Sequence, residues 1–301
     1  MAEVATFATS DQLLVVIDPL ARRTDGESVR IAKDVLSAGA ATKVCMPEGP
    51  EEFARVLSRR GSRRPVVVGD DRALLRAVSL LHRRRELAGC ALSMVPVGGA
   101  LSLAGALGVP TGAVAAARAV LDGAVRRMDL LVDDSDGVVL GALRIPPLLL
   151  REAPPEETVA EPSGAGHLWL RTCQSLVRTL VPARTSREPL SSALPRQPGP
   201  ARLRVEVDGM TLVDLDQPVE GISVTPGASG LAEVEVRPVS VGAEASPLYA
   251  SGRTVTVSGT DFRYRADAVV AGPVRTRTWV VREGAWGLTL PGGRVGRGDG
   301  G

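Results

Sequence analysis

The first half of the chain alternates short apolar runs with amphipathic stretches. Apolar runs of strand length lie at residues 13–17, 42–46, 65–68 and 91–95. Apolar side chains at helical spacing lie at residues 27–38, 51–60, 73–85 and 113–121. Such alternation is typical of βαβ units, in which helices cover both faces of a parallel sheet. We therefore expect an α/β protein with an N-terminal three-layer domain, and Gly39 as the C-terminal cap of its first helix.

The pattern changes twice along the rest of the chain. Two further apolar runs, 128–132 and 138–143, flank Asp136-Gly137, which predicts a β-hairpin. A Pro-rich stretch then interrupts any regular pattern, and beyond it the apolar period becomes two. We predict an α/β domain at 11–145, a linker at 146–200 with one helix near 168–180, a mainly β, sandwich-like domain at 201–292, and a disordered tail at 293–301.

Composition and charge exclude several classes of protein. The 36 basic and 34 acidic residues give a formal net charge of +2, too close to balance for a nucleic-acid binder that relies on phosphate neutralisation. Residues 1–11 lack the pattern of a secretory signal, and Pro96 and Pro110 interrupt the long uncharged stretch 87–117. We expect a cytoplasmic protein. The three cysteines lie far apart in the sequence, a spacing that argues against a structural zinc site or a disulfide framework; they are Cys45, Cys90 and Cys173.

Three loops at the carboxyl ends of predicted strands are the candidates for ligand binding, since parallel α/β sheets bind ligands at that edge. The first loop begins Asp18-Pro19. The second reads Gly-Asp-Asp-Arg-Ala at 69–73, and the third reads Pro-Val-Gly-Gly-Ala at 96–100. Each precedes a helical or small-residue stretch, as a phosphate-binding loop does. The alternative for Asp71 is a helix N-cap, a role that aspartate often fills.

In these loops the chain resembles the diacylglycerol kinase family. That family shows a strand ending in Asn-Pro, a Gly-Gly-Asp-Gly-Thr loop and a Pro-x-Gly-Thr-x-Asn-Asp segment, with a β-rich second domain behind. The Arg-Arg-Met-Asp-Leu segment at 126–130 and the Phe-Arg-Tyr-Arg-Ala-Asp segment at 262–267, followed by Gly272-Pro273, are similar to later parts of the family pattern. The resemblance covers most of residues 13–290.

The resemblance implies a lipid kinase fold, also similar to that of NAD kinases, that transfers phosphate from ATP, with Mg²⁺, to a lipid hydroxyl. It implies that Asp267 belongs to the catalytic element and that Asp71 holds the metal ion. The residues that it implies for nucleotide binding are Asp18, Gly69, Asp70, Asp71, Arg72, Gly98 and Gly99.

Several positions depart from the family pattern. Asp70 and Arg72 stand where glycines would let backbone N–H groups approach phosphate, and Ala73 replaces threonine. In the third segment threonine, asparagine and aspartate are replaced, in that order, by Gly99, Leu101 and Ser102. After Asp267, Ala268 and Val269 replace glycine and the glutamate that would act as base.

Two hypotheses follow from these departures. The chain is either a lipid kinase with altered motifs, or a non-catalytic relative that binds a lipid, nucleotide or protein partner as a regulator. Basic clusters at 59–64 and 83–85 fit peripheral contact with anionic lipids at the inner membrane face, or solvated helix ends. We expect Tyr264, Trp279 and Trp286 to be core aromatics. The sequence carries no signal of oligomeric state.

Overall fold

A computed structural model describes residues 12–147, 200–227, 229–239 and 246–292. These residues form one compact unit. The predicted helix near 168–180 and the predicted tail at 293–301 lie outside the described residues.

The N-terminal strands form the predicted parallel sheet. The four strands are β1 (Gln12–Ile17), β2 (Ala41–Cys45), β3 (Arg64–Gly69) and β4 (Ala91–Pro96). Their order is β4-β3-β1-β2, and every neighbouring pair runs parallel. The connections between them contain helices. Parallel strands need such long crossover connections, because a tight turn can join only antiparallel strands.

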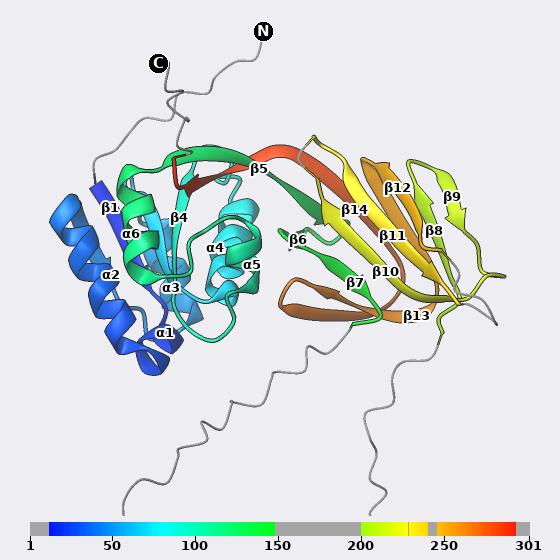
Figure 1. Cartoon of the computed structure of the whole chain (residues 1–301), viewed down its shortest axis with the longest axis horizontal. Helices are drawn as coiled ribbons and strands as arrows, with labels where there is room; N and C mark the ends of the chain where they lie inside the picture. Colours follow the sequence, from blue (N-terminus) through cyan, green and yellow to red (C-terminus); the bar gives the residue numbers. More distant parts are fainter. Residues whose placement is uncertain (1–11, 148–199, 228, 240–245, 293–301) are drawn as a thin grey trace, which may run out of the picture. The chain divides into compact units, whose positions relative to one another are not determined.

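Helices cover both faces of this sheet, which confirms the three-layer prediction (Figure 1). Successive side chains of β1 point to opposite faces. Leu13, Val15 and Ile17 belong to the core under α2 and α6, whereas Leu14 and Val16 belong to the core under α3 and α4. The helices are α1 (Pro19–Thr24), α2 (Gly26–Gly39), α3 (Pro50–Ser58), α4 (Asp71–Arg83), α5 (Ser102–Ala106) and α6 (Ala113–Asp122).

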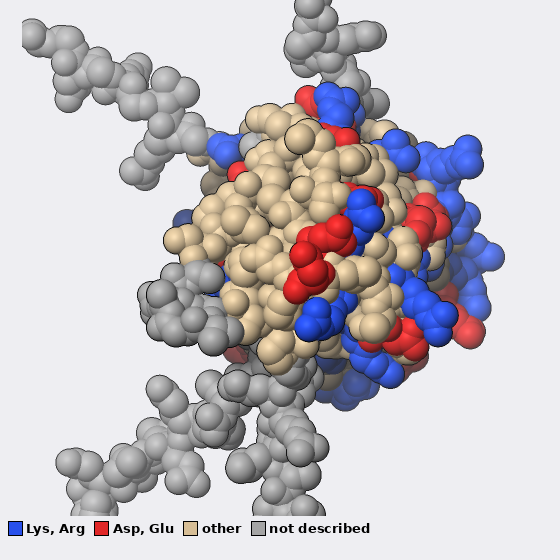
Figure 2. Space-filling model, turned by 90° about the vertical axis from the view of Figure 1, so that its right-hand side faces the viewer, with Lys and Arg blue, Asp and Glu red and all other residues tan. Residues whose placement is uncertain are grey.

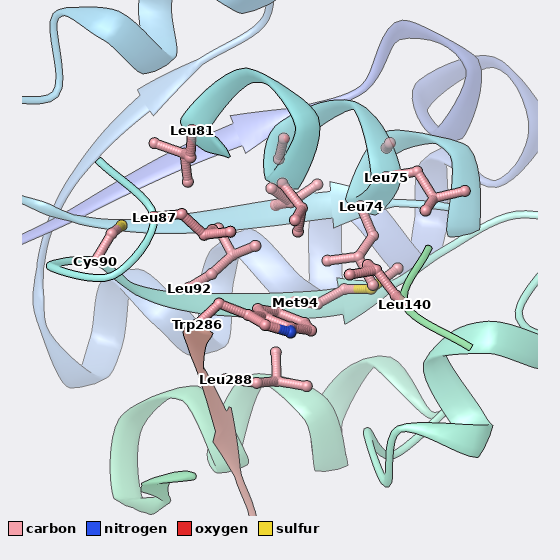
Figure 3. Packing of buried hydrophobic residues seen from close by; sticks show 14 of the residues in the cluster. Leu74, Leu75, Leu81, Leu87, Cys90, Leu92, Met94, Leu140, Trp286 and Leu288 are labelled. Atoms are coloured by element: carbon pink, nitrogen blue, oxygen red, sulfur yellow. The ribbon is translucent and has the colours of Figure 1, made fainter. Parts of the chain in front are cut away.

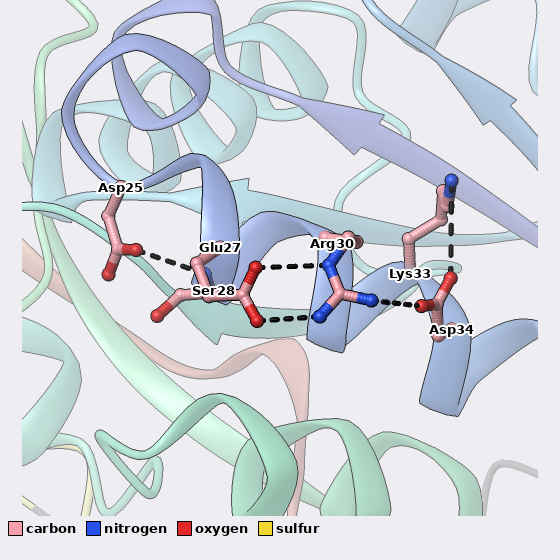
Figure 4. A network of polar contacts seen from close by, with 6 residues as sticks. All are labelled: Asp25, Glu27, Ser28, Arg30, Lys33 and Asp34. Carbon is pink, nitrogen blue, oxygen red and sulfur yellow. Dashed lines mark hydrogen bonds and ion pairs between the residues drawn. The ribbon is translucent and has the colours of Figure 1, made fainter.

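Surface contacts set the start of α2 (Figure 4). The Asp25 carboxylate accepts the backbone N–H of Ser28 at 3.0 Å, and the Ser28 hydroxyl together with this N–H lowers the pKa of Asp25. Arg30 lies 2.6 Å from Glu27 and 3.5 Å from Asp34 along the same exposed face. These pairs favour the helix but are exposed, so they contribute little to global stability.

The prediction for Gly39 is wrong in its detail. Gly39 is the last residue of α2, and Ala40 is the cap. A Cβ at Gly39 would lie 2.4 Å from a methyl carbon of Leu121. The glycine therefore lies where α2 and α6 approach each other closely, and it does not turn the chain into a left-handed conformation.

The remaining strands form the β-rich region predicted for the C-terminal part. The short strands β6 (Val138–Val139) and β7 (Leu143–Ile145) follow β5 (Ala124–Asp133). The strands after residue 200 are β8 (Leu203–Val207), β9 (Met210–Val213), β10 (Val219–Pro226), β11 (Ala232–Pro238), β12 (Leu248–Gly252), β13 (Thr254–Ala266) and β14 (Val269–Leu290). Neighbours within this group pair antiparallel.

The hairpin predicted at Asp136-Gly137 is confirmed, because β5 and β6 pair across it. The Asp133 carboxylate holds the turn by accepting the backbone N–H groups of Ser135 and Gly137, both at 2.8 Å. The prediction of one strand over 138–143 is wrong. Backbone N–H groups between β6 and β7 bind a side chain, as described below, so a loop separates the two strands.

β14 connects the α/β and β-rich regions. It pairs antiparallel with β13 and β5, and its last part pairs parallel with β4 through Gly287 opposite Ala91. The hydroxyl groups of Ser93 and Thr289, both buried, form a 2.8 Å hydrogen bond beside this pairing. The result is one continuous sheet of 14 strands in the described part of the chain.

The core under α4 includes β14 as well as the N-terminal strands. Figure 3 shows Trp286 beside Leu92 and Met94 of β4, with Leu74 and Leu81 of α4 above them. Trp286 is fully buried, and its indole N–H donates to the carbonyl oxygen of Asp129 at 3.4 Å. The expectation of core roles for Tyr264, Trp279 and Trp286 is confirmed by their burial.

The surface of the β-rich region carries charges of both signs. Figure 2 shows acidic and basic side chains interspersed on the face at that end, next to uncharged surface. Mixed charge of this kind produces no strong field of one sign. Among the described residues, no helix has the length and apolar character needed to cross a membrane.

Trp286→Ala should destabilise the protein by about 3–5 kcal/mol, because it removes a fully buried aromatic side chain between two secondary-structure layers. The free energy of unfolding from urea titration measures the effect. Met210→Ala is the control, since Met210 is 78% exposed and should change stability by no more than about 0.5 kcal/mol. A loss below about 1 kcal/mol for Trp286→Ala would contradict the packing described here.

Candidate functional site

The three candidate loops meet at the carboxyl edge of the parallel sheet. A Cβ at Gly69 would lie 3.0 Å from the Cβ of Asp18, and a Cβ at Gly98 would lie 3.4 Å from the Cβ of Asp70. The backbone N–H of Val97 donates to the carbonyl oxygen of Gly69 at 2.9 Å, which ties the second loop to the third. The structure thus brings together the residues that the sequence selected at this edge.

Asp18 is the N-cap of α1, and its buried carboxylate forms an ion pair with a half-buried arginine. Its Oδ1 accepts the backbone N–H of Leu20 at 2.8 Å, and its Oδ2 lies 2.7 Å from a guanidinium nitrogen of Arg76. The Arg76 guanidinium also lies over the ring of Phe53, 5.5 Å from its centre. Arg76 also lies at this edge, but it was not selected from the sequence. It could have been found because it lies one helical turn after Arg72 and so belongs to the same side of α4.

Asp70 is the N-cap of α4. Its Oδ1 accepts the backbone N–H of Ala73 at 3.1 Å, and the residue is only 8% exposed. The first N–H groups of a helix have no partner within the helix, and they are the donors that phosphate uses in phosphate-binding loops. Here a carboxylate of the same chain already accepts one of them.

Asp71 has its carboxylate directed at the third loop. Its Oδ2 accepts the backbone N–H of Leu103 at 2.9 Å, and its Oδ1 accepts that of Ala104 at 3.0 Å. The Ser102 hydroxyl is 3.4 Å from Oδ2. Asp71 is 3% exposed and caps α5 rather than α4. Both oxygens are therefore engaged by backbone donors 32 and 33 residues away.

The other predicted residues at this edge differ in their surroundings. Gly69 is confined, since a Cβ there would lie 2.7 Å from that of Ala73. Gly98 has a φ of 124°, a conformation that favours glycine. Gly99 is exposed with open space around it, and Arg72 is exposed on the first turn of α4. Only these last two residues face solvent freely.

Asp267 lies at the tip of the β13–β14 hairpin and holds the loop between β6 and β7. Its two carboxylate oxygens accept the backbone N–H groups of Leu140, Gly141 and Ala142 at 2.7–2.9 Å. A Cβ at Gly141 would lie 3.0 Å from the Asp267 Oδ1 and 2.6 Å from a methyl carbon of Leu103. The loop that Asp267 holds, between β6 and β7, therefore packs against α5, the helix that Asp71 caps.

Burial raises the pKa of Asp267 above the ordinary aspartate value, although three backbone N–H donors oppose the shift. The negative charge of nearby Asp71 adds to the increase. Withdrawal from water disfavours a charged carboxylate, and a like charge does the same. The two acidic groups retained from the family pattern thus lie near each other, and both are occupied by backbone N–H groups.

This set of residues does not fit Mg²⁺ and the phosphates of ATP. Magnesium requires free oxygen ligands, and phosphate at such an edge requires free N–H donors. Here Asp70 and Asp71 accept N–H groups of the chain itself. Across the described ranges, no three acidic, histidine or cysteine side chains gather as a metal-binding set.

Known structures share the fold of this chain. A diacylglycerol kinase from Bacillus anthracis str. Sterne matches with a TM-score of 0.63 at 11% identity. Two further structures from the same organism, of proteins assigned the same activity, match with TM-scores of 0.65 and 0.66 at 11% and 12% identity. Each match covers 93% of this chain and 97% of the other. No protein-family model and no curated protein matches the sequence. The chain therefore has a diacylglycerol kinase-like fold.

Asp71→Ala should lower the free energy of unfolding by about 2–6 kcal/mol without any nucleotide or metal present, because two buried N–H groups lose their acceptor at about 1–3 kcal/mol each. Urea titration in EDTA measures this change. Arg72→Ala, one residue away and exposed, is the control and should change little. If Asp71 were instead an uncompensated metal ligand, its removal would leave the stability of the metal-free protein unchanged or raise it.

The raised pKa of Asp267 predicts a pH dependence. The unfolded protein has an ordinary aspartate pKa of about 3.9, whereas the folded protein has a higher one, so the folded protein binds this proton more tightly. The free energy of unfolding therefore increases as pH falls through the raised pKa, and it decreases as pH rises through it. Asp267→Asn cannot titrate. The stability of the unmutated protein relative to this variant should therefore increase from pH 7 toward pH 4, with a slope of at most about 1.4 kcal/mol per pH unit.

Urea titrations of both proteins across this pH range measure the difference. A difference for Asp267→Asn that shrinks as pH falls would mean that the N–H donors dominate and lower the pKa.

Proposed function

We propose that this chain uses its diacylglycerol kinase-like fold for binding or regulation and does not transfer phosphate. One observation carries the proposal: the carboxylate of Asp71 accepts the backbone N–H groups of Leu103 and Ala104. The metal ligand that the family resemblance implies at this position is thus a structural cap. Freeing it for Mg²⁺ would leave two buried donors unsatisfied, at a cost of about 1–3 kcal/mol each.

Charge at the N-terminus of α4 supports the same proposal. A carboxylate about 4 Å from a phosphate charge disfavours binding by about 1 kcal/mol in water and about 4 kcal/mol at an effective dielectric of 20. Asp70 is in such a position if phosphate approaches α4, and its burial favours the larger value. The helix dipole, which normally attracts phosphate, is already compensated by this residue.

The residue at the position implied for the catalytic base also supports a function without phosphate transfer. Val269 stands where the resemblance places a glutamate, and the valine is 55% exposed at the start of β14. A hydrocarbon side chain cannot accept a proton from an attacking hydroxyl. The preceding Asp267 is bound by three N–H groups and would have to release them to replace the missing base.

The alternative is ATP-dependent phosphorylation of diacylglycerol or a similar lipid at a membrane surface. The fold shared with a diacylglycerol kinase over 93% of the chain favours it. It requires that Asp70 and Asp71 leave their N–H partners when nucleotide arrives. Nucleotide binding therefore separates the two functions.

We expect titration calorimetry with Mg-ATP to give no saturable heat for the unmutated protein, and labelled ATP with diacylglycerol vesicles to give no labelled lipid above a boiled control. Asp70→Gly removes the carboxylate at α4 and should increase whatever affinity for Mg-ATP remains. Asp25→Gly is the matched control, because it removes the corresponding cap of α2. Saturable Mg-ATP binding together with a kinase rate that Asp71→Ala abolishes would overturn the proposal.

A further inference from the structure

A hollow on the outer face of the β-rich region has no role in the function proposed above. Its volume is about 260 Å³, and three hydrogen-bonded strands, β7, β10 and β11, form it (Figure 1). In the sheet order β7 is separated from β4 by β13 and β14, so the hollow is distinct from the edge that holds Asp70 and Asp71. The side chains that matter are Arg144, Glu220, Gly221, Ser223, Glu235 and Arg237.

The strand register explains why the surface is hollow. Ser223 of β10 lies opposite Arg144 on one neighbouring strand and Glu235 on the other. Gly221, two residues earlier, lies opposite Arg237. Small residues on the middle strand therefore form a floor between longer side chains. The register shifts between Val219 and Gly221, and such bulges change the direction of a side chain, here that of Glu220.

The backbone does not require glycine at position 221. A Cβ there would meet only the carbonyl oxygen of Ile145, at an ordinary 3.7 Å, and its φ lies outside the left-handed region. Glycine in a strand interior weakens the strand unless close approach or open space gives it a role. Close approach is excluded by the distances. The remaining role of Gly221 is therefore to leave the floor of the hollow open.

The polar groups around the floor differ in how they are paired. Arg237 lies 2.7 Å from Glu235, so these two neutralise each other. Arg144 is exposed, and within the described ranges neither its guanidinium nor the Ser223 hydroxyl opposite it forms an ion pair or hydrogen bond. The exposed Glu220 carboxylate makes no direct bond there either, but it lies near Arg237, whose pKa is raised first by the bond to Glu235 and to a smaller extent by the charge of Glu220. The hollow thus presents a guanidinium with a hydroxyl, and a carboxylate that no described group bonds directly.

We propose that this hollow binds a small zwitterion, with its carboxylate or phosphate against Arg144 and Ser223 and its ammonium group toward Glu220. Guanidinium binds both kinds of oxyanion through paired N–H donors, and a few converging polar groups are typical of small-molecule sites. A volume of about 260 Å³ admits a molecule the size of an amino acid or a phosphorylated amino alcohol. Both share an oxyanion and an ammonium group on a short carbon chain.

Titration of the full chain, followed by NMR or calorimetry, tests the proposal with alanine and O-phosphoethanolamine as the two zwitterions. Inorganic phosphate, acetate and ethanolamine supply the separate halves. We expect at least one zwitterion to bind about tenfold more tightly than either of its halves, since two charged contacts act together. Binding of alanine alone indicates a carboxylate ligand, and binding of O-phosphoethanolamine alone indicates a phosphate ligand. If neither binds more tightly than its halves, the proposal is wrong.

Three variants locate the site. Arg144→Ala and Glu220→Gln, both at exposed positions, should each weaken binding of the zwitterion about tenfold, and Gly221→Leu should abolish it by filling the floor. Arg275→Ala, an exposed arginine outside the hollow, is the control and should bind normally. Circular dichroism checks folding, and if Gly221→Leu does not fold, the two charge variants decide. Unchanged binding in both charge variants would overturn the assignment.

Discussion

The pairing of β14 with β4 is the interaction on which the rest of the architecture depends. β14 is 22 residues long, and its first part forms the β-rich region with β13 while its last part completes the core under α4. At the end of β14 the chain also approaches Gly123, between α6 and β5, so closely that a Cβ at this glycine would lie 2.3 Å from the carbonyl oxygen of Leu290. The buried hydroxyl pair of Ser93 and Thr289 fixes the register, because either hydroxyl without the other would be left unsatisfied.

This arrangement also fixes the surroundings of the acidic residues that the family resemblance singles out. Asp267 reaches the loop before β7 only because the β13–β14 hairpin ends beside α5. Asp71, in turn, holds α5 in place. The carboxylates that a kinase would direct at metal and phosphate are here part of the contact between the two regions. Carboxylates can thus hold a fold together at the positions where another protein of that fold binds a ligand, and fold alone does not determine activity.

Much of this fold could be predicted from the sequence, because buried parallel strands and amphipathic helices have strong local patterns. Two helices could not. At α1 the Asp18-Pro19 pair predicts the start of a loop, although proline also favours the first turn of a helix. At α5 the residues are mostly small and have no apolar periodicity, and the helix depends on a cap from Asp71, about thirty residues earlier. Local sequence cannot reveal such a cap.

The same limit applies to the site. Sequence spacing predicted that the three loops would meet, which follows from the parallel sheet alone. It could not show whether Asp70 or Asp71 caps α4, nor that Arg76 pairs with Asp18 across 58 residues, because both depend on side-chain direction in the folded chain.

The position of β14 has a consequence for synthesis on the ribosome. Ser93 and Thr289 are separated by 196 residues, so the core under α4 lacks Trp286 and Leu288 until the ribosome has made the whole β-rich region up to β14. Contacts of such long sequence separation form slowly, and apolar surface remains exposed while they are missing. The apolar face of the nascent α/β region therefore stays partly exposed until β14 has been made. A chaperone that binds exposed apolar surface would act during this interval.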